Sequence, residues 1–261
     1  MPSSNAKLNS QRGDNFSPFD IWEKGGLTEH LGGINATRRL LAKCSLNEGM
    51  KVLNVGCGTG YTACTLGKDY GTQVVALDIN QRSIAEAGKR VSKQGVNEKV
   101  LLIQADTHKL PFINDVFDAV IIESVLVFCN AAEVLTKIHR VMKQGSVIGI
   151  NEFTFLKPPP ARLVSLLTGT LGIYAFQQKE WETVLRKAGF LDVKTTIHKI
   201  NLWDQLASHL QVDGLKKYLA SIVIGVGDKS IRGMFFRKEM LAAAFDFLPY
   251  VGYGIYTGNK L

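Results

Sequence analysis

Short blocks of apolar residues alternate along the first 156 residues with stretches in which apolar residues recur every three or four positions. The blocks have the length of buried strands, and the stretches have the period of helices with one apolar face. The predicted strands span 51–55, 73–78, 99–104, 117–122 and 146–151, and the predicted helices begin near residues 35, 61, 80 and 134. Strands that alternate with helices predict an α/β fold with a mostly parallel sheet.

The first predicted strand runs straight into three glycines at alternate positions, Gly56, Gly58 and Gly60. Glycine suits a tight turn into a helix because it takes positive φ values and lets a ligand approach the backbone closely. Asp78 ends the second strand, 22 residues after Gly56, where a carboxylate can accept hydrogen bonds from two ribose hydroxyls. Together these residues predict a site for a nucleoside-containing cofactor.

The spacing of the glycines decides between cofactors. The dinucleotide fingerprint G-x-G-x-x-G/A keeps its last position small so that the helix packs on the strand, and Tyr61 stands at that position here. An NAD-dependent oxidoreductase is therefore disfavoured. The pattern resembles motif I of the class I methyltransferases that depend on S-adenosylmethionine (SAM). The order of elements through about residue 156 is similar too, most of all to the ubiquinone and menaquinone methylases and the phospholipid N-methylases.

The resemblance implies a Rossmann-like class I methyltransferase fold, with a seven-stranded, mostly parallel sheet and helices on both faces. It also implies which residues bind SAM and its product S-adenosylhomocysteine (SAH). These are Leu31, Gly32, Gly33, Asn54, Gly56, Cys57, Gly58, Gly60, Asp78, Ile79, Ala105, Asp106, Thr107, Glu123, Ser124 and Val125. Asn54 departs from the motif, which usually has Asp or Glu there, and an amide lacks the charge that helps to hold the SAM ammonium group.

The reaction that the resemblance implies needs no nucleophile from the enzyme, because SAM carries an activated methyl group. The protein chiefly holds the acceptor in line with the leaving sulfur, and a base is needed only when the acceptor must lose a proton. Glu152, just beyond the fifth predicted strand, is the first candidate for a base or for orienting the acceptor, followed by Glu123 and His108. A capping or solvent-facing role is the alternative for each of the three.

Three parts of the chain are predicted. Residues 1–34 form an N-terminal tail and a lid arm, residues 35–156 form the SAM-binding core, and residues 157–261 complete the sheet. The last two strands, near 193–198 and 252–256, usually pair as an antiparallel hairpin in the family, yet about 50 residues separate them here. We expect this insertion, about 202–249, to be helical and to cover the substrate.

Composition indicates a globular protein that folds in a reducing cytoplasm. Of its 261 residues 46% are hydrophobic, and its longest apolar stretches fall short of the roughly 20 residues that cross a bilayer. Residues 1–18 contain no apolar signal segment. The four cysteines form no C-x-x-C pair, which argues against a zinc site or a disulfide framework. We therefore expect no metal.

The formal net charge of +8 is concentrated in the second part of the chain, with +2 for residues 1–156 and +6 for residues 157–261. Basic residues lie among apolar ones in the insertion. This pattern would suit a lipid or isoprenoid acceptor drawn from an anionic membrane, with peripheral membrane contact. The alternative is that the apolar residues form the insertion's own core.

Other functions remain open at this point. The basic second part motivates an RNA methyltransferase, but no RNA-binding module is recognisable, and Glu123-Ser124-Val125 stands where a base methylase has an Asn-Pro-Pro-Tyr type motif. A non-catalytic nucleotide-binding module is a third hypothesis, against which the intact set of ligand positions counts. We expect a small-molecule acceptor, which could be a lipid, a quinone or an amine, and no DNA. The sequence does not determine the oligomeric state.

Overall fold

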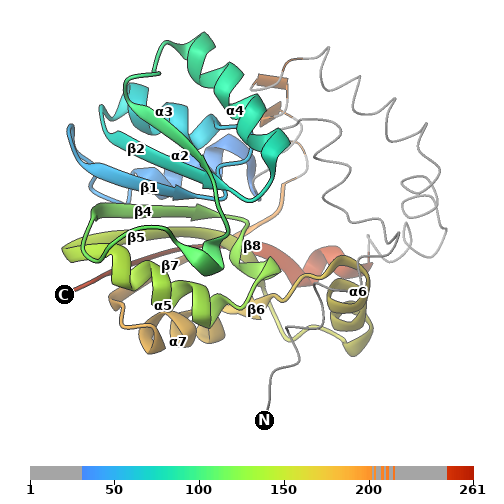
Figure 1. Cartoon of the computed structure of the whole chain (residues 1–261). Coiled ribbons are helices and arrows are strands. Elements are labelled where there is room, and N and C mark those ends of the chain that lie inside the picture. The colour runs from blue at the N-terminus through green and yellow to red at the C-terminus, as the bar shows by residue number, and fades with distance from the viewer. Residues whose placement is uncertain (1–30, 202, 204–206, 209, 212–213, 215–245) are drawn as a thin grey trace.

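The structure is a computed structural model, which describes residues 31–201, 203, 207–208, 210–211, 214 and 246–261. An eight-stranded sheet runs through this part of the chain in the order β3-β2-β1-β4-β5-β8-β7, with β6 paired to β5 beside that path (Figure 1). The strands are β1 (Lys51–Val55), β2 (Gln73–Asp78), β3 (Val100–Gln104), β4 (Phe117–Glu123), β5 (Met142–Phe155), β6 (Phe176–Gln177), β7 (Leu191–Lys199) and β8 (Val251–Asn259).

All pairs from β3 across to β5 are parallel, and β8 is antiparallel to both of its neighbours. The two strands that flank the insertion therefore pair as the predicted antiparallel hairpin. The expected α/β fold with a mostly parallel sheet is confirmed, and the short β6 adds an eighth strand to the predicted seven.

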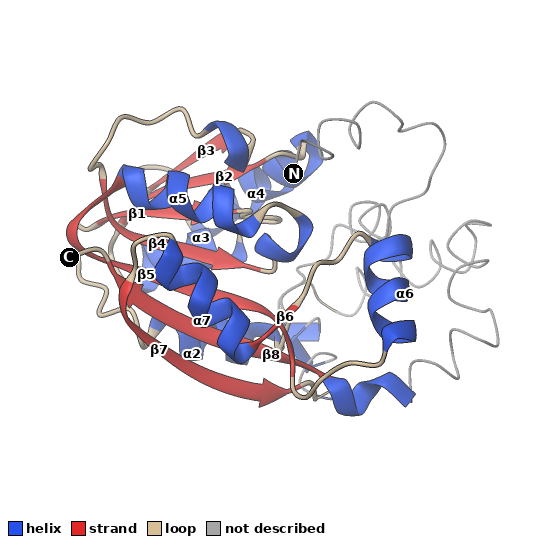
Figure 2. Cartoon of the chain, turned by 90° about the horizontal axis from the view of Figure 1, so that it is seen from below, coloured by secondary structure: helices blue, strands red, loops and turns tan. Residues whose placement is uncertain are grey.

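Helices cover both faces of the sheet. Figure 2 shows α5 (Ala131–Val141) and α7 (Gln178–Lys187) in front of one face. The opposite face packs against α2 (Gly33–Leu41), α3 (Tyr61–Asp69) and α4 (Gln81–Gln94), whose apolar residues share one buried cluster with that face. A further helix, α6 (Ala161–Leu171), lies beyond the carboxyl ends of the parallel strands (Figures 1 and 2).

Local sequence signals explain where these helices begin and which face they bury. The side chain of Asn80 accepts hydrogen bonds from the backbone N–H groups of Arg82 and Ser83 and so caps α4, which begins near residue 80 as predicted. The apolar stripe of α5 is buried at Val134, Leu135, Ile138 and Val141. Three short 3₁₀ segments complete the described elements, η2 (Thr107–Lys109), η3 (Leu126–Phe128) and η4 (Leu248–Tyr250).

The fifth strand is longer at both ends than the sequence pattern indicates. The sequence predicts 146–151, whereas β5 begins at Met142 and continues to Phe155, and β8 pairs with it from Val147 to Phe155. Glu152 consequently lies inside β5, and its predicted place just beyond the strand is wrong.

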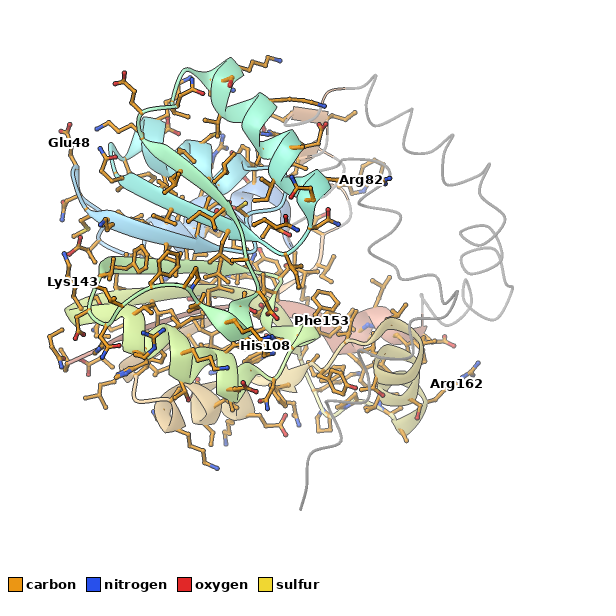
Figure 3. The ribbon with its side chains drawn as sticks, viewed as in Figure 1. Glu48, Arg82, His108, Lys143, Phe153 and Arg162 are labelled. Atoms are coloured by element: carbon orange, nitrogen blue, oxygen red, sulfur yellow. The ribbon has the colours of Figure 1, made fainter. Side chains whose placement is uncertain are left out.

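The carboxyl ends of β1 to β4 meet at one edge of the sheet, and His108 and Phe153 lie at that end in Figure 3. Glu48 and Lys143 lie at the opposite end. Residues 1–30 of the predicted lid arm and most of the insertion fall outside the described residues. The three-part division of the chain therefore stays a prediction.

Candidate cofactor and acceptor site

The glycine loop after β1 combines close packing with one open face. Gly56, Gly58 and Gly60 all have positive φ, +66°, +49° and +81°, which a side chain would strain. A Cβ on Gly56 would overlap the side chain of Val125, and one on Gly60 would lie 2.9 Å from the Cβ of Ala87. A Cβ on Gly58 would have no neighbour within 4 Å. Two of the glycines thus permit packing, and the third leaves space where a ligand can approach the backbone.

Thr59, between the second and third glycines, is held from α4. The Nε of Arg90 donates to the Thr59 carbonyl oxygen at 3.0 Å, and its Nη2 donates to the Thr59 hydroxyl oxygen at 3.4 Å. No sequence signal predicts this contact, because an arginine in the middle of a helix carries no pattern that links it to a loop 31 residues earlier.

Asp78 joins the glycine loop to the end of β2. Its Oδ2 accepts from the Gly58 N–H at 2.9 Å, and its Oδ1 accepts from the Asn80 N–H at 2.9 Å. Burial raises the pKa of this carboxyl group, while the backbone hydrogen bonds partly oppose the shift. A carboxylate has about four acceptor positions, so two remain for ligand hydroxyls. Ile79 follows with two thirds of its surface exposed at the same edge.

The end of β3 lies beside Asp78, since the Ala105 N–H donates to the Asp78 carbonyl oxygen at 3.0 Å. Asp106 caps η2, and its Oδ1 lies 2.8 Å from the backbone nitrogen and 2.9 Å from the ring Nδ1 of His108. Partial burial opposes ionisation of Asp106, but these hydrogen bonds outweigh it and hold the pKa below its ordinary value. The backbone of Thr107 continues this turn.

Glu123 ends β4 and is buried, with 4% of its surface exposed. Its two oxygens accept from the hydroxyls of Thr37 in α2 at 2.8 Å and Thr62 in α3 at 2.7 Å. These contacts span 86 and 61 residues of sequence, and no sequence signal pointed to either threonine. Glu123 therefore links two helices to the sheet. Because both of its oxygens already accept hydrogen bonds, it is a weaker candidate base than Glu152.

Leu31 contacts β5 and the residue that follows β4. Its carbonyl oxygen accepts from Asn151 Nδ2 at 2.8 Å, and its N–H donates to Ser124 Oγ at 3.4 Å. Ser124 has a φ of +56°, a left-handed conformation that non-glycine residues rarely adopt. Gly32 packs against the ring of Tyr253, where a Cβ would overlap it. The start of the described chain is thus placed at the same edge as the glycine loop.

Glu152 faces the side of the sheet covered by α5 and is fully buried. Its Oε1 accepts from the N–H groups of Val125 at 2.7 Å and Leu126 at 2.6 Å, whereas Oε2 has no hydrogen-bond partner among the described residues. Burial raises the pKa of this carboxyl group to about 8, although the backbone donors pull it down.

Asn54 is a second buried acceptor without a partner. Its Oδ1 has none among the described residues, and its Nδ2 lies 3.4 Å from the Ile121 carbonyl oxygen. Cys57, inside the glycine loop, is 4% exposed, and burial raises the pKa of its thiol. A thiol that stays protonated is a poor nucleophile, so Cys57 serves the loop as a small residue.

Comparison with known proteins settles the family. A family model described as a methyltransferase domain matches residues 46–189, more than half of the chain. The chain belongs to the methyltransferase domain family. The predicted class I methyltransferase fold is thereby confirmed. The matched region contains β1 to β6 and ends just after α7, so it includes the glycine loop, Asp78, Asp106 and Glu152.

Curated relatives of this methyltransferase domain match only part of it. A sterol 24-C-methyltransferase of Gibberella zeae is 38% identical over 109 residues, which cover 41% of this chain and 29% of that protein. A ubiquinone/menaquinone biosynthesis C-methyltransferase of Coxiella burnetii is 34% identical over 140 residues, which cover 52% of this chain and 54% of that protein. The chain thus spans under a third of the first relative and about half of the second.

Solved structures share the fold over nearly the whole methyltransferase chain. A SAM-dependent methyltransferase of Geobacter sulfurreducens, solved with SAH, has a TM-score of 0.73 at 18% identity and covers 95% of this chain and 99% of that one. The [4+2]-cyclase SpnF has a TM-score of 0.72 at 20% identity and covers 93% and 92%. At these identities the likeness establishes the fold alone.

Proposed function

We propose that this protein binds SAM at the carboxyl edge of its sheet and transfers the methyl group to a small-molecule acceptor. One observation carries the proposal. Gly58 leaves open space above the loop while its N–H is fixed to Asp78, which keeps two acceptor positions for ribose hydroxyls. The membership of residues 46–189 in the methyltransferase domain family supports the same conclusion.

The residues at this edge fit the parts of SAM. Asp78 would accept from the ribose, and Asp106 with Ala105 and Thr107 would lie at the adenine. The unpartnered Oδ1 of Asn54 is an acceptor beside the glycine loop, and the ammonium group of SAM is a donor. An amide at this position binds a cation less strongly than a carboxylate does, so the loop and Asp78 carry more of the affinity.

SAM supplies an activated methyl group on a sulfonium. The chain's own task is to hold the acceptor close and to keep water out. The apolar cluster on the α5 side extends past the strand ends and includes Phe128, Phe153, Ile173, Phe247 and Tyr250. Such a wall would exclude water from the reacting atoms. Glu152 and His108 remain the candidates that could receive a proton from an acceptor at this edge.

This apolar wall favours an apolar acceptor, such as a quinone, an isoprenoid or a lipid, over a small charged amine. The relatives named above are a sterol methyltransferase and a quinone-biosynthesis methyltransferase, which agrees with this class. No helix in the described part of the chain is long and apolar enough to cross a bilayer. We propose peripheral contact with an anionic membrane as the route to such an acceptor, and failure to co-sediment with anionic liposomes would count heavily against it.

A cyclase among the structural neighbours shows that this fold serves other reactions. SAH binding is therefore necessary but not sufficient for the proposal. The test has two stages: calorimetric titration with SAM, SAH and NADH, and then incubation with methyl-labelled SAM and a panel of quinone, sterol, phosphoethanolamine and tRNA acceptors. Label in an apolar acceptor supports the proposal, label in tRNA supports the RNA alternative, and binding of NADH alone overturns it.

A further inference from the structure

Glu152 reaches from β5 to the turn that follows β4. Its Oε1 accepts two short hydrogen bonds, 2.7 Å from Val125 N and 2.6 Å from Leu126 N. These N–H groups open the 3₁₀ segment η3 (Leu126–Phe128), where the first backbone donors have no partner within the segment. The carboxyl group of Glu152 therefore fixes the path of the chain just after β4.

Val125 connects this turn to the glycine loop. Its side chain packs directly on Gly56, so closely that a Cβ on Gly56 would overlap the Val125 Cγ2 atom. Ser124, immediately before it, is held in a left-handed conformation and donates from its N–H to the Asn151 carbonyl oxygen at 2.8 Å. The contacts form a chain from Glu152 in β5, through Val125, to the first glycine after β1.

We propose that Glu152 is a positioning residue, which holds the turn at Val125 and Leu126 so that the Val125 side chain supports the glycine loop in its ligand-binding form. The inference rests on the proposed function, because the loop's ligand is taken to be SAM or SAH. It assigns Glu152 a different role from the proton acceptor that its sequence position suggested.

The geometry supports a positioning role directly. Oε1 is committed to two backbone donors, and these bonds hold the turn whether or not Oε2, which has no partner among the described residues, takes up a proton. The amide oxygen of glutamine can accept the same two bonds, but the amide cannot take up a proton. Leucine fills a similar volume and leaves both N–H groups without an acceptor. The pair Glu152→Gln and Glu152→Leu therefore tests the positioning role independently of any proton uptake.

The experiment measures two quantities on the full chain: the Kd for SAH by calorimetry, and amide hydrogen exchange of Val125 and Leu126 by NMR. We expect Glu152→Gln to match the wild type in both. Glu152→Leu should raise the Kd and speed exchange at the two amides by roughly tenfold or more, because buried donors lose their acceptors. Tight binding by Glu152→Leu, or a Glu152→Gln variant as weak as it, would overturn the proposal.

Two further variants keep the test decisive. Val125→Ala retains the backbone bonds to Glu152 but removes the methyl groups that cover Gly56, so it should weaken SAH binding even if Glu152→Leu does not fold. Wild-type affinity in Val125→Ala would refute the route through this residue. Thr154→Val, two residues along β5, removes a buried hydrogen bond to Tyr256 Oη and should leave the Kd unchanged.

The outcomes also separate this inference from the proposed function. If the wild type does not bind SAH, the proposed function fails, while the exchange of the two amides still tests whether Glu152 holds the turn. If the wild type binds SAH and Glu152→Leu binds it equally well, only the positioning role fails.

Discussion

Arg90 in α4 donates two hydrogen bonds to Thr59, at 3.0 Å to its carbonyl oxygen and at 3.4 Å to its hydroxyl. Thr59 is flanked by two glycines, and glycine loses more conformational freedom on ordering than any other residue. A contact from a rigid helix reduces the number of conformations that the loop samples without a ligand. Arg90 thus restrains the loop through Thr59, whether or not a ligand is bound.

We expect Arg90→Met to weaken SAH binding by about five- to thirtyfold, because one or both of the lost hydrogen bonds contribute about 1 kcal/mol each. Calorimetric titration measures the Kd. The matched control is Lys93→Met, which removes an exposed positive charge from the same helix and should leave the Kd unchanged. Equal effects of the two variants would mean that helix charge, and not the contact with Thr59, sets the affinity.

Asp78 is the residue on which the cofactor assignment depends most. Replacement by Asn puts an NH₂ group against the N–H of Gly58 or Asn80, so it disturbs the loop and removes an acceptor for the ribose. We expect SAH affinity to fall by about tenfold or more in Asp78→Asn, as measured by calorimetry. Asp69→Asn, an exposed carboxylate at the end of α3, is the control and should bind SAH normally.

Binding should also respond to acid through Asp78. Burial raises the pKa of this group above its ordinary value, and only the ionised form keeps all of its acceptor positions. The Kd for SAH should therefore begin to rise at a higher pH than an ordinary aspartate would require. An Asp78→Asn variant with the same pH profile as the wild type would show that another group titrates.

The sequence predicted those parts of the site that depend on local backbone form. Gly56, Gly58 and Gly60 predict the loop, because positive φ is rare in other residues. The apolar run before Asp78 predicts the strand that ends at this residue. The helix start near residue 80 is local in the same sense, because the Asn80 side chain accepts from N–H groups two and three residues later. Each of these signals lies within a few residues of the structure that it specifies.

The contacts that span the fold were not predictable in this way. Glu123 and Thr37 are 86 residues apart, and Asn151 and Leu31 are 120 apart. Such pairs depend on which strands become neighbours. The prediction that Glu152 lies just beyond the fifth strand is wrong for a related reason. The apolar run ends at Asn151, and pairing with β8 and β6, which are distant in sequence, extends β5 to Phe155.

Glu123 gives a prediction about stability. Gln at this position has one acceptor oxygen for two hydroxyl donors, so either Thr37 or Thr62 must accept from the amide NH₂ and its own O–H proton loses its acceptor. We expect Glu123→Gln to lower the free energy of unfolding by about 1–3 kcal/mol, as measured by urea denaturation at pH 7. The control is Glu133→Gln, which removes an exposed pair with Lys137 and should cost at most about 1 kcal/mol. Equal losses would mean that Glu123 does not link the helices.

Glu152 gives a prediction about pH. Burial raises its pKa from 4.5 to about 8, so the folded protein binds this proton more tightly than the unfolded chain. A group of this kind contributes stability that is fully present below the unfolded pKa and is lost as the pH rises through the folded value. The wild type should therefore lose stability from this source between about pH 4.5 and 8.

Glu152→Gln removes that dependence because its amide does not titrate. The free energy of unfolding of the variant minus that of the wild type should therefore rise with pH, by up to about 1.4 kcal/mol per unit between pH 5 and 8. Urea denaturation at pH 5, 6, 7 and 8 measures the difference, in which the contribution of every histidine cancels because both proteins retain them. In Glu133→Gln the difference should stay nearly constant, since its partner Lys137 lowers the pKa of Glu133 and keeps it ionised over this range. A difference for Glu152→Gln that is flat from pH 5 to 8 would show that Glu152 is ionised in the folded protein throughout, held so by its two backbone donors.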